Sequence, residues 1–212
     1  MKHTKALGLA ALAVVVATAL IGTTSAQATV LCKTNAGAEC GAEKWGVGTT
    51  MNAQLEIAEL FTLRSTGGGV EVECKQSAFQ VVIENAGSAT TTVVGKVAGG
   101  SITWGVCSAT TTTVSGGEIE FHWINATNNA TVTGKGISVK FEGGGLTCIY
   151  GFGAGMIDIG TFTGGLVPRI DLKAVVTKQA GSSFLCQTDQ IMEGEYEIQP
   201  NGEEKAMYAR EK

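Results

Sequence analysis

The chain has 212 residues, of which 44% are hydrophobic and 16% charged, and its formal net charge is −4 at pH 7. An acidic excess disfavours nucleic acid and anionic membrane surfaces as partners, because both repel a negatively charged protein. Thirty glycines against two prolines, with abundant threonine and valine, are typical of an all-β chain.

The first 28 residues have the pattern of a secretory signal peptide. Lys2 and Lys5 precede an apolar run rich in alanine, valine and leucine, and Ala26 and Ala28 are the small residues that a signal peptidase needs. A permanent membrane anchor is the alternative, but the run is short for a span. We therefore expect cleavage after Ala28, secretion to the outside or the cell surface, and no stable membrane span afterwards.

The remaining residues, 29–212, have the length of one domain and can bury a sizeable core. Once the two signal-peptide lysines are removed, 13 basic and 19 acidic residues remain, which gives a net charge of about −6. The acidic residues are scattered rather than grouped in a tail, and no long linker interrupts the chain. We expect a single domain.

Short segments of alternating apolar and polar residues follow one another along this domain, separated by glycine pairs and triplets. A helix over residues 53–63 is the one competing interpretation, because alanine, glutamate and leucine favour helices. The alternation up to residue 57 favours a strand there. Besides the opening stretch, the expected strands are 51–57, 70–74, 79–84, 91–97, 101–107, 118–124, 137–141, 146–150, 156–162, 170–177 and 192–199.

The last of these strands shows the clearest alternation. In residues 192–199 the even positions hold Met, Gly, Tyr and Ile, whereas the odd positions hold Glu, Glu, Glu and Gln. A period of two indicates a strand with one buried and one solvated face. About eleven such strands suit an antiparallel β-sandwich, Ig-like or jelly-roll-like, and a β-barrel is the alternative.

Six cysteines lie in the secreted part: Cys32, Cys40, Cys74, Cys107, Cys148 and Cys186. An even number behind a signal peptide indicates disulfides formed in an oxidising compartment. Fifteen pairings are possible. We favour pairing in chain order, because the first bond then closes a short loop and the other two each tie strands that flank a hairpin or meander.

Residues that could carry catalysis are few. His122 is the one histidine of the secreted part, no Gly-x-Ser-x-Gly motif is present, and no Cys-x-x-Cys suggests zinc or redox chemistry. Glutamates two residues apart recur in several strands, and a solvated strand face has the same appearance. We expect no enzyme, no cofactor and no metal site, although calcium bound by a carboxylate cluster stays open.

The tryptophans are the residues that a carbohydrate-binding protein would use for stacking against sugar rings. Trp104 and Trp123 alternate in phase with apolar neighbours, which predicts that both face the core. Trp45 lies in a glycine-rich stretch, so we expect it to be exposed. It is the candidate binding residue.

Several short motifs resemble a set of small secreted, cysteine-containing β proteins of actinobacteria with no assigned function. The motifs are Val30-Leu31-Cys32-Lys33-Thr34-Asn35, Ile102-Thr103-Trp104-Gly105-Val106-Cys107, Cys148-Ile149-Tyr150-Gly151, Ser183-Phe184-Leu185-Cys186, Tyr196-Glu197-Ile198 and Met207-Tyr208-Ala209. The resemblance spans the secreted part and implies a disulfide-bonded, secreted fold. It brings no catalytic residue with it, and the final strand is more acidic here.

Together these observations predict a secreted, non-catalytic binding or structural protein that acts at the cell envelope or outside the cell. Its partner is then an envelope polymer or a protein. The alternatives are a carbohydrate- or small-ligand-binding module and a secreted hydrolase of unrecognised type.

Overall fold

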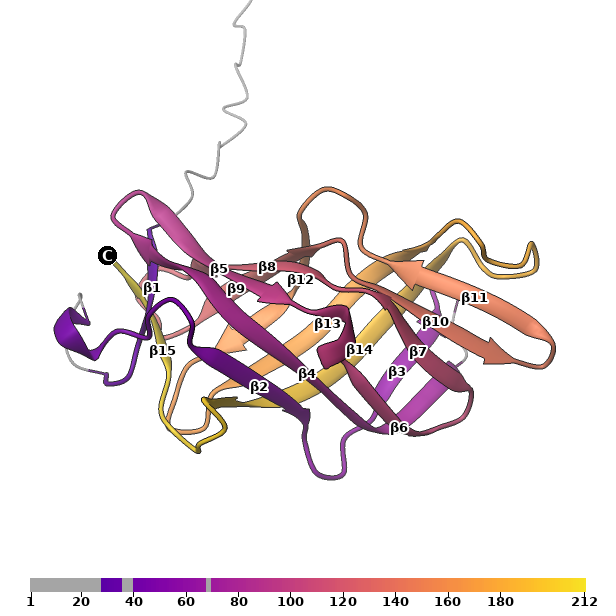
Figure 1. The fold of residues 1–212 in the computed structure, drawn as a ribbon, viewed down its shortest axis with the longest axis horizontal. Coiled ribbons are helices and arrows are strands. Elements are labelled where there is room, and N and C mark those ends of the chain that lie inside the picture. Colours follow the sequence, from indigo (N-terminus) through magenta and orange to yellow (C-terminus); the bar gives the residue numbers. More distant parts are fainter. Residues whose placement is uncertain (1–27, 36–39, 68–69) are drawn as a thin grey trace, which may run out of the picture.

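The computed structural model describes residues 28–35, 40–67 and 70–212 (Figure 1). The predicted signal peptide, residues 1–28, lies outside the described residues except for Ala28. The expected all-β class is confirmed. The elements are the short 3-10 turns η1 (Gly41–Glu43) and η2 (Gly99–Ser101) and the strands β1 (Thr29–Cys32), β2 (Thr50–Leu55), β3 (Phe61–Ser65), β4 (Val70–Ser88), β5 (Thr91–Val97), β6 (Thr103–Cys107), β7 (Thr110–Ser115), β8 (Gly117–Trp123), β9 (Ala130–Lys135), β10 (Ser138–Gly143), β11 (Leu146–Gly151), β12 (Ile157–Thr163), β13 (Arg169–Lys178), β14 (Asp189–Pro200) and β15 (Tyr208–Glu211).

Hydrogen bonding closes eight of these strands into an antiparallel barrel. The order round the ring is β2, β4, β5, β8, β9, β12, β13 and β14, and β14 pairs back with β2. The expected sandwich is therefore wrong, and the alternative, a barrel, is the fold. Both architectures bury one face of each strand, so the alternation of residue types is the same in either.

The wall of the barrel is split at several places. Strands β2 and β3 lie end to end in one position, because both pair with β14 on one side and with β4 on the other. The loop 56–60 between them leaves the wall, and Ile57 is fully exposed. The strand expected over 51–57 therefore ends at Leu55, and the helix considered over 53–63 does not form.

The long strand β4 shows the same splitting on its other edge. It joins the two strands expected over 70–74 and 79–84 into one. Its first half pairs with β6 and its second half with β5, so β5 and β6 also lie end to end. A register shift between Ile83 and Asn85 marks a bulge, which is how a long strand bends round a barrel.

A second, incomplete ring continues the barrel towards the right of Figure 1. It consists of β3, β4, β6, β7, β10, β11, β13 and β14. Its two edges, β6 and β7, are linked through side chains: Trp104 Nε1 donates a hydrogen bond to Thr113 Oγ1 at 3.1 Å. The threonine run 110–113 is part of edge strand β7.

The opposite end of the barrel, on the left of Figure 1, is closed by the small sheet of β1 and β15. β1 packs across β4, β5 and β8, and β15 packs on β8 and β12. One face of this plug contributes Leu31 and Ala209 to the main core. Its other face forms a second cluster of Val30, Cys32, Cys40 and Tyr208.

Trp45 lies beneath this plug and is not a surface residue. Its side chain is only 4% exposed, and its Nε1 donates to the carbonyl of Ala206 at 3.3 Å. The expected exposure of Trp45 is therefore wrong. The residues around it fold back against the barrel end, and the backbone N–H of Trp45 bonds to the carbonyl of Leu31 at 2.8 Å.

Three disulfides join the cysteines in chain order, as the sequence predicts. The bonds are Cys32–Cys40, Cys74–Cys107 and Cys148–Cys186, and no free cysteine occurs in the described chain. The first lies in the plug, the second links β4 to β6, and the third ties β11 to the segment before β14. Two of the three bonds thus strengthen the incomplete ring.

Candidate functional site

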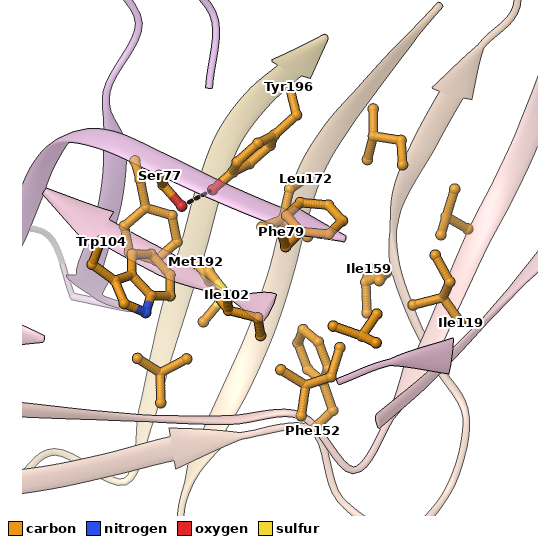
Figure 2. A pocket seen from close by; sticks show the side chains of 16 residues that line it. Ser77, Phe79, Ile102, Trp104, Ile119, Phe152, Ile159, Leu172, Met192 and Tyr196 are labelled. Carbon is orange, nitrogen blue, oxygen red and sulfur yellow. Dashed lines mark hydrogen bonds between the residues drawn. The ribbon is translucent and has the colours of Figure 1, made fainter. Parts of the chain in front are cut away.

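The barrel encloses an apolar cavity of about 60 Å³ between its two rings (Figure 2). Three of its residues come from places where the wall splits: Ile102 precedes β6, Ile137 lies between β9 and β10, and Phe152 follows β11. The N–H of Phe152 bonds to the carbonyl of Ile137 at 2.9 Å, which joins two of these breaks. The other lining residues are Phe61, Ser77, Phe79, Val97, Trp104, Ile119, Val132, Val139, Ile159, Ile170, Leu172, Met192 and Tyr196.

One polar pair faces this cavity. Tyr196 Oη donates to Ser77 Oγ at 3.0 Å, and the two side chains point at one another in Figure 2. Burial raises the pKa of Tyr196 far above its ordinary value, and the hydrogen bond with Ser77 offsets this only partly. The tyrosine is therefore a neutral hydroxyl at all physiological pH values. An apolar cavity with so few polar partners does not hold water stably.

A second cavity, of about 440 Å³, opens at the end of the barrel opposite the plug. It contains more polar groups than the inner cavity: Tyr150 Oη donates to the carbonyl of Gln187 at 3.1 Å, and Gln190 Nε2 donates to Tyr150 Oη at 3.4 Å. We call this cavity the mouth. Its lining residues are Leu63, Val72, Ser108, Ala109, Phe141, Gly143, Gly144, Leu146, Cys148, Tyr150, Leu185, Cys186 and Gln187.

The mouth and the inner cavity are successive layers of one barrel interior. In a strand, residues two positions apart share a face and lie about 7 Å apart. On β3 and β10, and on the stretch that leaves β11, one residue of such a pair lines the mouth and the other lines the inner cavity. The pairs are Leu63 and Phe61, Phe141 and Val139, and Tyr150 and Phe152.

The aromatic residues that suggested sugar stacking point into the barrel. Trp104 lines the inner cavity and meets the ring of Phe61 edge to face, with 4.7 Å between ring centres. Trp123 packs against the core, and its Nε1 donates to the carbonyl of Thr127 at 2.9 Å. Tyr150 and Tyr196 are buried. Trp104 and Tyr196 line the inner cavity, Tyr150 lines the mouth, and Trp123 lines neither.

His122 lies on the outer wall of β8 next to a carboxylate and a hydroxyl. Its Nε2 is 3.3 Å from Glu120 Oε2 and 3.2 Å from Thr133 Oγ1. A relay of the serine-hydrolase kind uses the two ring nitrogens for the two partners, whereas here the same nitrogen faces both. The arrangement is that of neighbouring side chains on adjacent strands.

The row Glu193, Glu195 and Glu197 lies on the outer face of β14, as the alternation predicts. Arg64 and Lys173 both pair with Glu193, the latter at 3.1 Å. Burial opposes ionisation of Glu193, but the hydrogen bonds from Lys173 and Arg64 outweigh it, so the pKa of Glu193 is lowered. This row is a solvated face with ion pairs.

A neighbouring carboxylate, Glu56, behaves in the opposite way. Burial and repulsion by Glu195 raise its pKa, although Arg169 Nε lies 2.7 Å from its Oε1. A lowered folded-state pKa adds stability above the unfolded pKa, and this stability is lost as the pH falls through the folded pKa. When the folded-state pKa is raised instead, the ionised group lowers the stability of the fold above the unfolded pKa. Ionised Glu56 therefore destabilises the fold at neutral pH.

Replacing these two carboxylates should therefore change stability in opposite directions. We expect Glu193→Gln to lower the free energy of unfolding at pH 7 by about 1 kcal/mol, and Glu56→Gln to leave it unchanged or raise it. The difference in the free energy of unfolding between each variant and the wild type should shrink as the pH falls below the folded-state pKa values of both carboxyl groups. Urea unfolding of both variants at several pH values measures this, and equal losses at pH 7 would contradict the assignment.

A third hollow, of about 560 Å³, is shallow and lies outside the barrel. Glycines at the wall breaks form its floor, and its charged side chains pair with one another, with Lys135 Nζ 2.9 Å from Glu118 Oε1 and Lys96 Nζ 3.8 Å from Glu84 Oε1. No tryptophan, tyrosine or phenylalanine is among its described lining residues. It lacks the stacking surface that a sugar site uses.

Among the described residues, no group of three or more His, Cys, Asp or Glu side chains is placed to hold a metal ion. No helix in the described ranges is long and apolar enough to cross a bilayer. Comparisons with protein families, with curated proteins and with solved structures find no match to this chain.

The candidate site thus differs from the one that the sequence suggested. Trp45 packs beneath the plug, whereas the cavities are lined by residues whose sequence pattern is that of an ordinary core. The breaks that open the inner cavity have a sequence signal, since Gly99, Gly100, Gly116 and Gly136 all lie at or beside them. Such glycines also mark simple turns, so the signal does not distinguish a break in a barrel wall from a hairpin.

Proposed function

We propose that this protein is a secreted, non-catalytic binding protein that holds a small apolar molecule inside its barrel. The observation that supports this most is the layered interior, in which an apolar inner cavity lies directly beneath an open mouth. The plug of β1 and β15 closes the other end.

The chemistry of the two layers indicates the kind of guest. The inner cavity offers aliphatic and aromatic contacts and a single hydroxyl pair, which suits a hydrocarbon segment. The mouth adds Ser108, Gln187 and the hydroxyl of Tyr150, which suit a polar end group. Ligand sites commonly combine an apolar lining with a few polar groups that fix orientation. The proposed guest is a small, elongated molecule with one polar end.

Secretion and a role outside the cell belong to the same proposal. The signal-peptide pattern of residues 1–28 and the three disulfides support an oxidising, extracellular compartment. The outward placement of His122 and the paired carboxylates on β14 support binding rather than catalysis.

Filling the mouth should reduce binding. Ala109 lines the mouth, so Ala109→Trp places a large ring in the entrance, whereas Ala154→Trp places the same ring in the outer hollow. With a fluorescent long-chain fatty alcohol as probe, we expect Ala109→Trp to weaken binding about tenfold or more, because the apolar contact is lost. Ala154→Trp should bind like the wild type.

The fluorescence of the three tryptophans, of which Trp104 lines the inner cavity, gives a second readout. Energy transfer from tryptophan to the bound probe should be strong in the wild-type protein, and near-ultraviolet circular dichroism should show that both variants remain folded. A probe that binds equally to all three proteins, or to none of them, would contradict the proposal.

A further inference from the structure

No charged side chain is among the described residues that line the mouth, although Lys178 Nζ lies beside it and donates to the carbonyl of Cys186 at 3.1 Å. Three segments supply most of its lining, residues 105–113, 143–151 and 179–188, and none of them contains Asp, Glu, Lys, Arg or His. Charged residues make up 16% of the chain, so an even distribution would place several here. The polar residues of these segments are Ser, Thr, Gln and Tyr, which are uncharged hydrogen-bonding groups.

Two large apolar side chains project beside this rim. Phe184 is 88% exposed and the adjacent Leu185 is 60% exposed. Single exposed apolar residues are common on protein surfaces, but an adjacent pair at the edge of an apolar cavity is a candidate contact surface.

The segment that carries this pair is firmly attached to β11. The disulfide Cys148–Cys186 fixes one side, the N–H of Ser183 bonds to the carbonyl of Thr147 at 2.8 Å, and Ser182 Oγ donates to the carbonyl of Ile149 at 3.1 Å. Phe184 lies between these anchors, so the fold holds its ring outward.

The charges of the chain lie elsewhere. On β3 and β4, Arg64 and Glu73 alternate with Leu63 and Val72, which line the mouth, so their side chains lie on the outer wall. The plugged end carries a mixed charged surface. Its charged residues include Lys33, Glu43, Lys44, Glu203, Glu204, Lys205, Arg210, Glu211 and Lys212. The lining of the mouth is therefore uncharged, and Glu142, Lys178 and Asp189 border the segments that supply most of it.

We propose that the mouth docks on an uncharged lipid surface, with Phe184 and Leu185 inserted at the boundary between headgroups and acyl chains. Apolar side chains surrounded by uncharged hydrogen-bonding groups match this boundary. The net negative charge of the chain opposes docking on anionic lipid, so the surface is neutral or zwitterionic.

Docking in this orientation would place the open end of the barrel against the lipid. An apolar guest could then enter the mouth from the lipid without crossing water, because the mouth opens at this end of the barrel. The docking surface itself requires no guest, so it is tested apart from the proposed ligand.

The test measures flotation of the disulfide-bonded secreted chain, residues 29–212, with vesicles of phosphatidylcholine alone and without any added guest. We expect the wild type to float with these vesicles. F184S/L185S should bind them at least about tenfold more weakly, because two exposed apolar side chains are lost. A matched control is L166S/V167S, whose residues are adjacent and 78% and 50% exposed in the turn between β12 and β13. It should bind like the wild type.

Three results would overturn the docking proposal: no flotation of the wild type, equal loss in both double variants, or binding that requires anionic lipid and disappears in high salt. A second copy of the chain as the occupant would show as concentration-dependent dimers that F184S/L185S abolishes. If Ala109→Trp weakens probe binding but the wild type does not float, the ligand proposal is supported and the docking proposal is contradicted.

Discussion

Replacing Cys148 and Cys186 together by serine should lower the free energy of unfolding by about 4 kcal/mol. The bond joins residues 38 apart, and the stabilisation from restricting the unfolded chain grows with the length of the closed loop. In the folded state the bond holds the segment 179–188 against β11 at the rim of the mouth. Urea unfolding of the oxidised wild type and of the double variant measures the loss.

The plug offers a matched control for this effect. Cys32–Cys40 closes a loop of only 8 residues, so C32S/C40S should lose about 2.5 kcal/mol, which is less than the loss at the mouth. The two variants should also differ in function: C148S/C186S should weaken both probe binding and flotation, whereas C32S/C40S should affect neither. A larger loss of stability in the plug variant would contradict the loop-length argument.

Substituting Gly87 by alanine should destabilise the barrel by about 3–5 kcal/mol. Gly87 has φ +75°, a conformation that disfavours any side chain, and a Cβ at this position would overlap the carbonyl oxygen of Thr29. Thr29 is fully buried and its Oγ1 accepts a hydrogen bond from the N–H of Trp123 at 2.8 Å. The substitution therefore displaces β1 from the barrel end.

The loss at Gly87 has two contributions, the backbone strain of a positive φ and the overlap with Thr29, and Gly48 allows them to be separated. Its φ is +84°, but a Cβ there would meet no heavy atom within 4 Å. Gly48→Ala should therefore show the backbone strain alone, about 1–2 kcal/mol, and the difference from Gly87→Ala reports the contact between β1 and β4. Thermal unfolding followed by tryptophan fluorescence measures both. Equal losses would show that the plug does not pack closely on Gly87.

In the proposed function, the plugged end of the barrel contributes stability and the mouth contributes binding. At the plugged end, Leu31 and Trp45 complete the core and the surface is charged. At the mouth, two disulfides strengthen strands that no continuous ladder closes, and Phe184 and Leu185 face solvent. Stability and binding are thus assigned to opposite ends, so variants at the plug and at the mouth should separate the two properties.

Much of the local structure could be predicted from the sequence alone. The alternation in residues 192–199 correctly identifies the buried face of β14, and the strand over 91–97 has the expected bounds. The disulfide pairing in chain order follows from cysteines that flank neighbouring strands. These properties depend on residues close in sequence, where the period of two and the spacing of turns carry the information.

The closure of the sheet, the position of Trp45 and both cavities were decided by tertiary structure. Alternation tells which face of a strand is buried but not which strand lies beside it, so β14 suits a sandwich and a barrel equally well. Its pairing with β2, more than 130 residues earlier in the chain, selects the barrel. Ile102, Ile137 and Phe152 line a cavity only because the wall splits beside each of them, and such splitting depends on hydrogen bonds between distant strands. The local sequence pattern therefore predicted the β class and favoured the observed disulfide pairing, and the long-range pairing of strands determined where a guest could be held.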